Sequence, residues 1–312
     1  MEYTNLGKTD ILISRITHGC MELGGMAHLY WEVKGEEENA TLLQIALENG
    51  ITTFDTAESY GDGHSETIVG KALKKVRSQC IIASKVAKEH LMPDDIQKAL
   101  EGSLRRLDTS YLDLYYIHWP NEAIPIEKTI DKLMRLKDQH MIRAIGVSNF
   151  SLAQLKDAMK YGEISAYQPE YNLLSRGIEK EIMPFCSDNR ISILSYNSLA
   201  KGILTGAFHL YGAKLEPKDF RNAKPHFQKA NMEIQKMLIL HLEEVAKKHS
   251  ATISQIAASW TLAQPGMTSA IIGTQNQKHF LENIQAFKIK LAADEICLIS
   301  EISDKVIQGM TL

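Results

Sequence analysis

Four ionisable residues stand at or just beyond the ends of three short apolar runs in the first half of the chain. They are Asp55 in FDTAESYG, Tyr60 five residues later, Lys85 in IIASKV and His118 in DLYYIHWP. If these runs are parallel strands, their carboxyl ends lie at one edge of a sheet and bring the four side chains together. We therefore consider them as one candidate site.

This combination suits the reduction of a carbonyl group. Hydride addition to C=O leaves an alkoxide, which a positioned neutral acid must protonate. The ordinary pKa of tyrosine is about 10, and an ammonium roughly 4 Å away stabilises phenolate by up to about 4 kcal/mol at an effective dielectric constant of about 20. We expect Lys85 to lower the pKa of Tyr60 and Asp55 to hold Lys85 charged. A neutral His118 would orient the carbonyl oxygen.

Each of these residues also has a simpler interpretation. Taken singly they could be a helix cap (Asp55), a surface aromatic (Tyr60), a solvated strand-end charge (Lys85) and a core histidine (His118). Their occurrence at the same ends of three consecutive strands favours the catalytic interpretation. A metal-dependent barrel hydrolase that uses Asp55, His64 and His118 is a further alternative. The absence of an HxH or HExxH motif argues against it, and we expect no metal.

Eight short apolar runs alternate with amphipathic stretches along the chain. Runs such as IIASK and ISILSY are almost continuously apolar, which is typical of strands buried on both faces. A strand followed by a helix, repeated eight times in this length, predicts an α/β fold whose parallel sheet closes into a (β/α)8 TIM barrel. The expected strands are residues 15–19, 52–55, 80–85, 112–118, 144–148, 166–168, 191–196 and 269–273.

The remaining segments complete this architecture. An N-terminal β-hairpin, with strands near residues 1–6 and 11–14, is expected to cap the bottom of the barrel. Residues 201–229 are rich in Gly, Pro, Asp, Asn and Lys and predict a functional loop over one face. No low-complexity linker is evident, so we expect one domain spanning residues 1–312. Helices are expected at residues 37–49, 94–107, 126–140, 151–161, 177–189, 231–249, 254–263 and 293–304.

Composition restricts the partners and the compartment. The formal net charge is -3 without a basic stripe, which argues against nucleic-acid binding. The four cysteines have no CxxC spacing, and the N-terminus has no signal-peptide pattern. No apolar stretch approaches the 18 residues that a membrane span requires. We therefore expect a cytoplasmic protein with reduced cysteines and a small-molecule substrate. Composition does not indicate the oligomeric state.

No standard nucleotide-binding motif is present. GDGHSE at residues 61–66 begins like GxGxxG but has Glu66 at the position of the last glycine, and no Walker A sequence occurs. Other polar groups at expected strand ends could hold a cofactor. Ser148, Asn149 and Gln168 could fix an amide, Tyr196 could stack on a flat ring, and Gly273-Thr274 could present free N–H groups to a phosphate.

Taken together, the segments resemble the aldo-keto reductase family over essentially the whole chain. FDTAESYGDGHSE, IIASKV, DLYYIHWP, IRAIGVSNF, QPEYNLLSR and AIIGTQNQKHFLEN occur in the family's order and spacing. QPEYNLLSR and DFRNAKPHF are similar to a bacterial subgroup of general reductases near inositol-catabolism proteins.

The resemblance implies reversible, metal-free reduction of aldehydes or ketones by hydride transfer from NAD(P)H, with Tyr60 as general acid in a tetrad with Asp55, Lys85 and His118. It also implies contacts to the cofactor and to the substrate. The implied cofactor residues are Cys20, Met21, Asp55, Ser148, Asn149, Gln168, Tyr196, Ser198, Leu199, Gly202, Arg221, Gly273, Thr274, Lys278, Glu282 and Asn283. The implied substrate residues are Tyr30, Trp31, Tyr60, His118 and Trp119.

Two departures from the family pattern affect these expectations. Family members often have Pro after the tyrosine of the seventh strand, where this chain has Asn197. Many members also carry basic residues around the 2′-phosphate, whereas GTQNQKHFLEN has His279 where Arg is common. Arg221 and Lys278 could still bind that phosphate, so NADP(H) is expected, with NAD(H) as the alternative. The alternative function is a cofactor-binding regulatory protein of the channel β-subunit type with little turnover.

Overall fold

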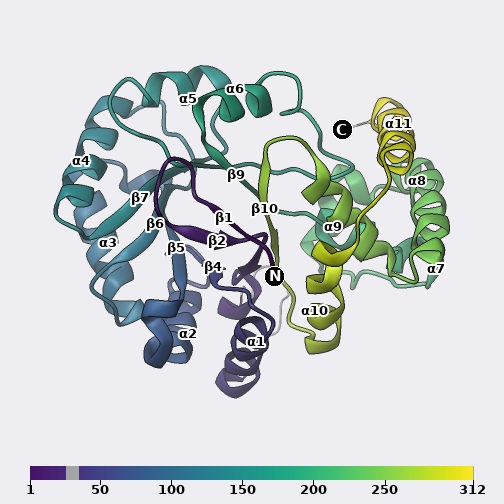
Figure 1. Ribbon diagram of the computed structural model, residues 1–312, viewed down its shortest axis with the longest axis horizontal. Coiled ribbons are helices and arrows are strands. Elements are labelled where there is room, and N and C mark those ends of the chain that lie inside the picture. Colours follow the sequence, from purple (N-terminus) through teal and green to yellow (C-terminus); the bar gives the residue numbers. More distant parts are fainter. Residues whose placement is uncertain (26–34, 312) are drawn as a thin grey trace.

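The computed structural model describes residues 1–25 and 35–311. Its barrel strands are β3 (Ile16–Gly19), β4 (Thr53–Asp55), β5 (Ile81–Val86), β6 (Leu112–Ile117), β7 (Ile142–Ser148), β8 (Ala166–Gln168), β9 (Ser192–Ser195) and β10 (Met267–Ile272). All eight are parallel, and they close in the order β10-β3-β4-β5-β6-β7-β8-β9 with helices around them (Figure 1). The predicted TIM barrel and its eight strands are therefore confirmed, with ends shifted by at most two residues.

An antiparallel hairpin of β1 (Tyr3–Asn5) and β2 (Leu12–Ser14) lies across one end of the barrel (Figure 1). The side chain of Leu6 in its turn is fully buried and packs with inward-facing strand residues. The N–H of Gly7 donates a hydrogen bond to Oγ of Ser192, the first residue of β9, at 2.8 Å. The hairpin therefore covers the amino-terminal ends of the strands and leaves the opposite end open for a site.

The helices of the described segments surround the sheet and account for every predicted helix. They are α1 (Glu36–Glu48), α2 (His64–Leu73), α3 (Pro93–Leu107), α4 (Ile126–Asp138), α5 (Leu152–Ala158), α6 (Ile182–Asn189), α7 (Ala207–Leu210), α8 (Lys229–Lys248), α9 (Ile253–Ala263), α10 (Gln277–Asn283) and α11 (Ala293–Gly309). In residues 1–25 and 35–311, none of them has the length and apolarity that crossing a bilayer requires.

Helix ends follow local sequence signals. Ser151 Oγ accepts the N–H of Gln154 at 3.2 Å, and Gln154 Oε1 accepts the N–H of Ser151 at 2.9 Å. This capping box, which stabilises a helix by about 1 kcal/mol, starts α5 directly after the polar end of β7. Its effect is to fix where Ser148 and Asn149 leave the sheet.

Two parts of the chain are more ordered than the sequence suggested. Helix α2 was not predicted and begins immediately after Gly63. The predicted loop at 201–229 contains short helical turns: η5 (Ala200–Thr205), α7 and η6 (Phe220–Ala223). The segment at 201–229 lines the cavity described next, and α2 follows directly after the loop that carries Tyr60.

Candidate active site

The four predicted catalytic side chains come together at the carboxyl ends of β4, β5 and β6. Lys85 Nζ lies 2.5 Å from Asp55 Oδ1 and 3.1 Å from Tyr60 Oη. The rings of Tyr60 and His118 meet edge-on, with centroids 5.7 Å apart. The four side chains therefore lie together, as the order of the strands predicts.

Lys85 is an ammonium group inside the protein, with no solvent-exposed side-chain surface. It donates to Asp55, to Tyr60 and to the carbonyl oxygen of Thr56 at 2.8 Å. Burial by itself would lower the pKa of Lys85, but the charge of Asp55 and the hydrogen bonds to Asp55 and Tyr60 outweigh burial and raise it. Lys85 is therefore charged at every physiological pH, as its proposed role requires.

The pKa of Tyr60 corrects the sequence-based expectation. We expected Lys85 to produce a net lowering, but burial raises the pKa of the phenol, and the ammonium of Lys85 only opposes that rise. The electrostatic effect of Lys85 has the expected sign and is smaller than the cost of burying a phenolate. Tyr60 is therefore protonated before reaction, which is the state that a proton donor needs.

His118 is neutral, as expected. Burial and the nearby charge of Lys85 lower the pKa of its imidazole to about 3. The hydroxyl of Ser59 lies 3.4 Å from His118 Nδ1. This contact leaves Nε2 as the ring nitrogen available for a hydrogen bond to a substrate oxygen.

Two glycines shape the loop that carries Tyr60. Gly61 has φ +58° and packs against the carbonyl oxygen of Gly24, so a side chain there would collide with backbone. Gly63 has φ +84° and packs against the guanidinium of Arg106. Arg106 also pairs with the buried Glu66 of α2 at 2.6 Å. The GDGHSE segment is therefore a close-packed turn that fixes Tyr60 and starts α2.

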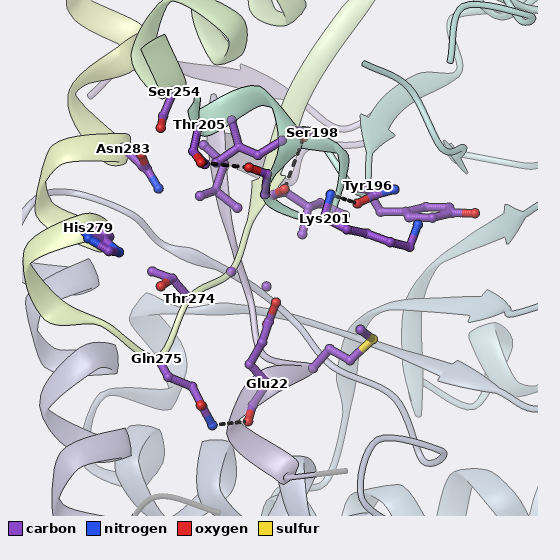
Figure 2. Close-up of a pocket in the computed structure, with 18 of the residues that line it drawn as sticks. Glu22, Tyr196, Ser198, Lys201, Thr205, Ser254, Thr274, Gln275, His279 and Asn283 are labelled. Atoms are coloured by element: carbon purple, nitrogen blue, oxygen red, sulfur yellow. Dashed lines mark hydrogen bonds between the residues drawn. The ribbon is translucent and has the colours of Figure 1, made fainter. Parts of the chain in front are cut away.

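The tetrad opens into a cavity of about 950 Å³, which is large for a ligand pocket and can accommodate a dinucleotide (Figure 2). Most of the expected cofactor residues line it. They are Met21, Asp55, Ser148, Asn149, Gln168, Tyr196, Ser198, Leu199, Gly202, Arg221, Gly273, Thr274, Glu282 and Asn283.

At the tetrad end of this cavity, the expected amide-binding residues form one hydrogen-bonded group. Asn149 Nδ2 donates to Ser148 Oγ at 3.0 Å, and Tyr196 Oη donates to Asn149 Oδ1 at 2.8 Å. Gln168 Nε2 donates to Asp55 Oδ2 at 2.7 Å. Gln168 therefore connects this group directly to the tetrad.

At the other end, Arg221 is already paired within the protein. Its Nε and Nη2 donate to the carboxylate of Asp219, with the shortest distance 2.7 Å, and its Nη1 donates to the carbonyl of Lys201 at 3.1 Å. A phosphate that binds Arg221 must compete with Asp219 for the guanidinium.

Several expected residues lie elsewhere. Cys20 is fully buried outside the cavity lining, and its N–H donates to the carbonyl of Asp55 at 2.9 Å. Lys278 is also outside the lining, with 82% of its side chain exposed. Trp119 lines the cavity. Tyr30 and Trp31 lie outside the described residues.

The cavity also contains polar residues that the sequence analysis did not assign. The labelled ones in Figure 2 are Glu22, Lys201, Thr205, Ser254, Gln275 and His279. Gln275 and His279 were visible in GTQNQKHFLEN, and Glu22 adjoins Met21, so their proximity to assigned residues was the available signal.

Asn197 explains one departure from the family pattern. Its φ is +58°, a value that the fixed ring of proline does not allow. Its Oδ1 accepts the N–H of Lys201 at 2.8 Å, where the backbone also has a positive φ. Asn197 therefore shapes the turn in η5 that borders the cavity.

The comparisons with known proteins agree with this geometry. The model of the aldo/keto reductase family matches residues 15–304. The chain belongs to this family. It is an aldo-keto reductase, an oxidoreductase that reduces carbonyl groups with NAD(P)H.

Three proteins illustrate what this aldo-keto reductase is similar to. Aldo-keto reductase YhdN of Bacillus subtilis (strain 168) is 38% identical over 286 residues, which cover 88% of this chain and 85% of that protein. NADH-specific methylglyoxal reductase of Escherichia coli (strain K12) is 31% identical over 97% of this chain and 99% of that protein. A Klebsiella pneumoniae aldo/keto reductase in complex with NADP and acetate is 26% identical, with TM-score 0.78 and coverage of 97% and 96%. None of these supports the regulatory alternative.

Proposed function

We propose that Tyr60 is the proton donor of this reductase and that NADP(H) is its preferred cofactor, with NAD(H) also accepted. The observation that supports the role of Tyr60 is its hydroxyl, which borders the cavity while Lys85 Nζ lies 3.1 Å behind it. A neutral phenol backed by a fixed cation is suited to release a proton when an alkoxide forms beside it.

The proposed residues have separate tasks. When bound, the nicotinamide supplies the hydride that adds to the carbonyl carbon. His118 Nε2 donates a hydrogen bond that orients the carbonyl oxygen, and Tyr60 gives its proton to that oxygen as negative charge develops. The ammonium of Lys85 then stabilises the phenolate of Tyr60, and solvent returns the proton.

A Tyr60→Phe variant tests this assignment. The variant keeps the ring and removes only the donor, so kcat should fall by about 10²–10⁴-fold, the usual contribution of a general acid. The affinity for NADPH should change by less than about threefold. Tyr161→Phe, a tyrosine outside the cavity, is the matched control. Loss of cofactor binding with kcat preserved at saturation would contradict the proposal.

Some observations favour NADPH as the cofactor, and others argue against a strict preference. Arg221 lines the cavity, and the similar Klebsiella protein was solved with NADP. Against a strict preference, Arg221 is held by Asp219, and the similar Escherichia coli enzyme is named as NADH-specific. We therefore expect a moderate preference for NADPH, which binding titrations with both reduced cofactors measure directly.

We also propose a small carbonyl compound as the substrate and the cytoplasm as the location. Trp119 is 48% exposed and borders the cavity beside His118, which suits an apolar wall for a small carbonyl compound. Tyr30 and Trp31, which lie outside the described residues, stay predicted substrate contacts. A cytoplasmic location is supported by four cysteines that are all free, three of them buried.

A further inference from the structure

Glu22 places an acidic side chain inside the cavity where a dinucleotide would lie. It belongs to η1 (Glu22–Gly24), directly after β3, and borders the cavity on the wall opposite η5. Figure 2 shows its carboxyl group directed toward the loop that carries Ser198 and Lys201, midway between Tyr196 and the residues of α10. This middle section is where the phosphates of the cofactor must pass if the nicotinamide lies on Tyr196.

Contacts with Gln275 and Gly273 place Glu22 at the cavity wall. The backbone carbonyl of Glu22 accepts a hydrogen bond from Gln275 Nε2 at 2.8 Å. Its Oε2 packs against Gly273 so closely that a methyl group on that glycine would collide with it. The carboxyl group therefore lies beside the end of β10, in contact with a residue that has no side chain.

The carboxyl group is also poorly compensated. Among residues 1–25 and 35–311, its sole hydrogen-bond donor is its own backbone N–H, and no cation forms an ion pair with it. Burial raises the pKa of Glu22 to about 7. A charged carboxylate here would face the negative phosphates of a bound dinucleotide, and the two charges would repel each other through a partly enclosed, weakly screened space.

We propose that Glu22 takes up a proton when the dinucleotide binds, so that cofactor affinity weakens as the solution becomes alkaline. This inference rests on the proposed nicotinamide site. In the protonated form the carboxyl group can donate a hydrogen bond to a phosphate oxygen, and in the charged form it opposes binding. The residue thus makes affinity depend on pH without taking part in hydride or proton transfer to the substrate.

The sign follows from the two protonation states. Phosphate raises the pKa of Glu22 in the complex above its value of about 7 in the free protein. Binding is therefore strongest below about pH 7, and above it the Kd rises by up to about tenfold per pH unit until the pKa of the complex is passed.

Other ionisable groups around Glu22 must be separated from this effect. Glu22 acts on the pKa of Cys20 and of Tyr60, which lie on the tetrad side with the pair Asp55–Lys85. Among the described residues, the other charged or titratable groups that line the cavity are His118 after β6, Tyr196 after β9, Lys201 of η5, Tyr211 after α7, Arg221 of η6, Glu243 and Lys247 of α8, and His279 and Glu282 of α10.

The test compares NADH binding by the wild-type protein and by Glu22→Gln between pH 6 and pH 9, using quenching or enhancement of NADH fluorescence. NADH is chosen because it lacks the titrating 2′-phosphate. Glu22→Gln should bind with nearly constant affinity, equal to the wild type at pH 6 and about tenfold tighter at pH 9. Glu243→Gln, which removes a cavity carboxyl that is not assigned to the cofactor, should keep the wild-type slope.

Calorimetric titration at pH 8 in two buffers of different ionisation enthalpy should show uptake of up to one proton by the wild type and none by Glu22→Gln. If Glu22→Gln does not fold, Glu22→Ala serves, since it also removes the titrating group. Equal pH slopes in wild type and variant, or no proton uptake by the wild type, would overturn the role of Glu22 alone. Failure of both NADH and NADPH to bind at any pH would overturn the cofactor site as well.

Discussion

The two ends of the cavity differ in how their charges are arranged. At the tetrad end, Lys85 and Asp55 are buried together, and each is hydrogen-bonded to further cavity residues. At the other end, which we propose holds the adenosine of the cofactor and call the adenosine end, Arg221 is bound to Asp219, and the side chain of Lys278 is exposed. The groups of the tetrad end are therefore paired with one another, whereas a phosphate at the proposed adenosine end would compete with Asp219 for Arg221.

This difference suggests which property each end controls. Groups that need no rearrangement can lower the energy of a transition state directly, because the cost of ordering them was met during folding. Groups that must leave an internal partner contribute only the difference between two interactions, which is small. We therefore expect large effects on rate from changes at the tetrad and small effects on cofactor choice from changes near Arg221.

Removing the cation at the tetrad end should have the largest effect. Lys85→Met keeps the length of the side chain but removes the charge that stabilises the phenolate of Tyr60, so kcat should fall by about 10³-fold. The same change leaves the buried carboxylate of Asp55 without its ion-pair partner, so the free energy of unfolding should fall by about 3–5 kcal/mol. Steady-state kinetics and denaturant titration measure the two effects.

A double variant separates these two consequences. Asp55→Asn with Lys85→Met removes both charges, so part of the stability should return while the activity stays low. If the double variant regained activity, the cation would have no role beyond pairing with Asp55.

Changes at the adenosine end should have a smaller effect. Arg221→Ala should raise the Kd for NADPH by about tenfold, which corresponds to one charge-assisted contact, and leave the Kd for NADH within about twofold. Asp219→Asn should act in the opposite direction, because it frees the guanidinium and removes a carboxylate that repels the phosphate. Titrations of both cofactors measure this selectivity. Equal weakening of NADPH and NADH would exclude Arg221 from the 2′-phosphate site.

The same contrast explains what the sequence predicted well. Asp55, Lys85 and His118 occupy strand ends, and strand ends are fixed by the hydrophobic pattern of a parallel barrel. Once the strands were placed, the meeting of these side chains followed from topology. The capping box at Ser151 was predictable for a different reason: it is local and depends on residues three positions apart.

Features that depend on contacts between distant segments were missed. GDGHSE was compared with a phosphate-binding motif, whereas its glycines allow close packing against Gly24 and Arg106, which lie 37 residues before and 43 residues after Gly61 and Gly63 respectively. The contact of the Glu22 carboxyl group with Gly273 also joins segments far apart in the sequence. The rise in the pKa of Tyr60 reflects burial, which residue spacing does not reveal.

The smallest effect expected is that of pH on the chemical step itself. His118 must be neutral, and its pKa of about 3 keeps it so above pH 5. Tyr60 must be protonated, and because burial raises its pKa above the ordinary phenol value, it stays so through pH 8.5. The kcat for reduction at saturating cofactor should therefore vary by less than about twofold between pH 5.5 and 8.5 if proton transfer limits the rate. Saturation removes the effect of Glu22 on cofactor affinity. A tenfold loss of kcat across this range would mean that a group at the tetrad end titrates there, and the contrast between a preformed catalytic end and an adjustable cofactor end would have to be abandoned.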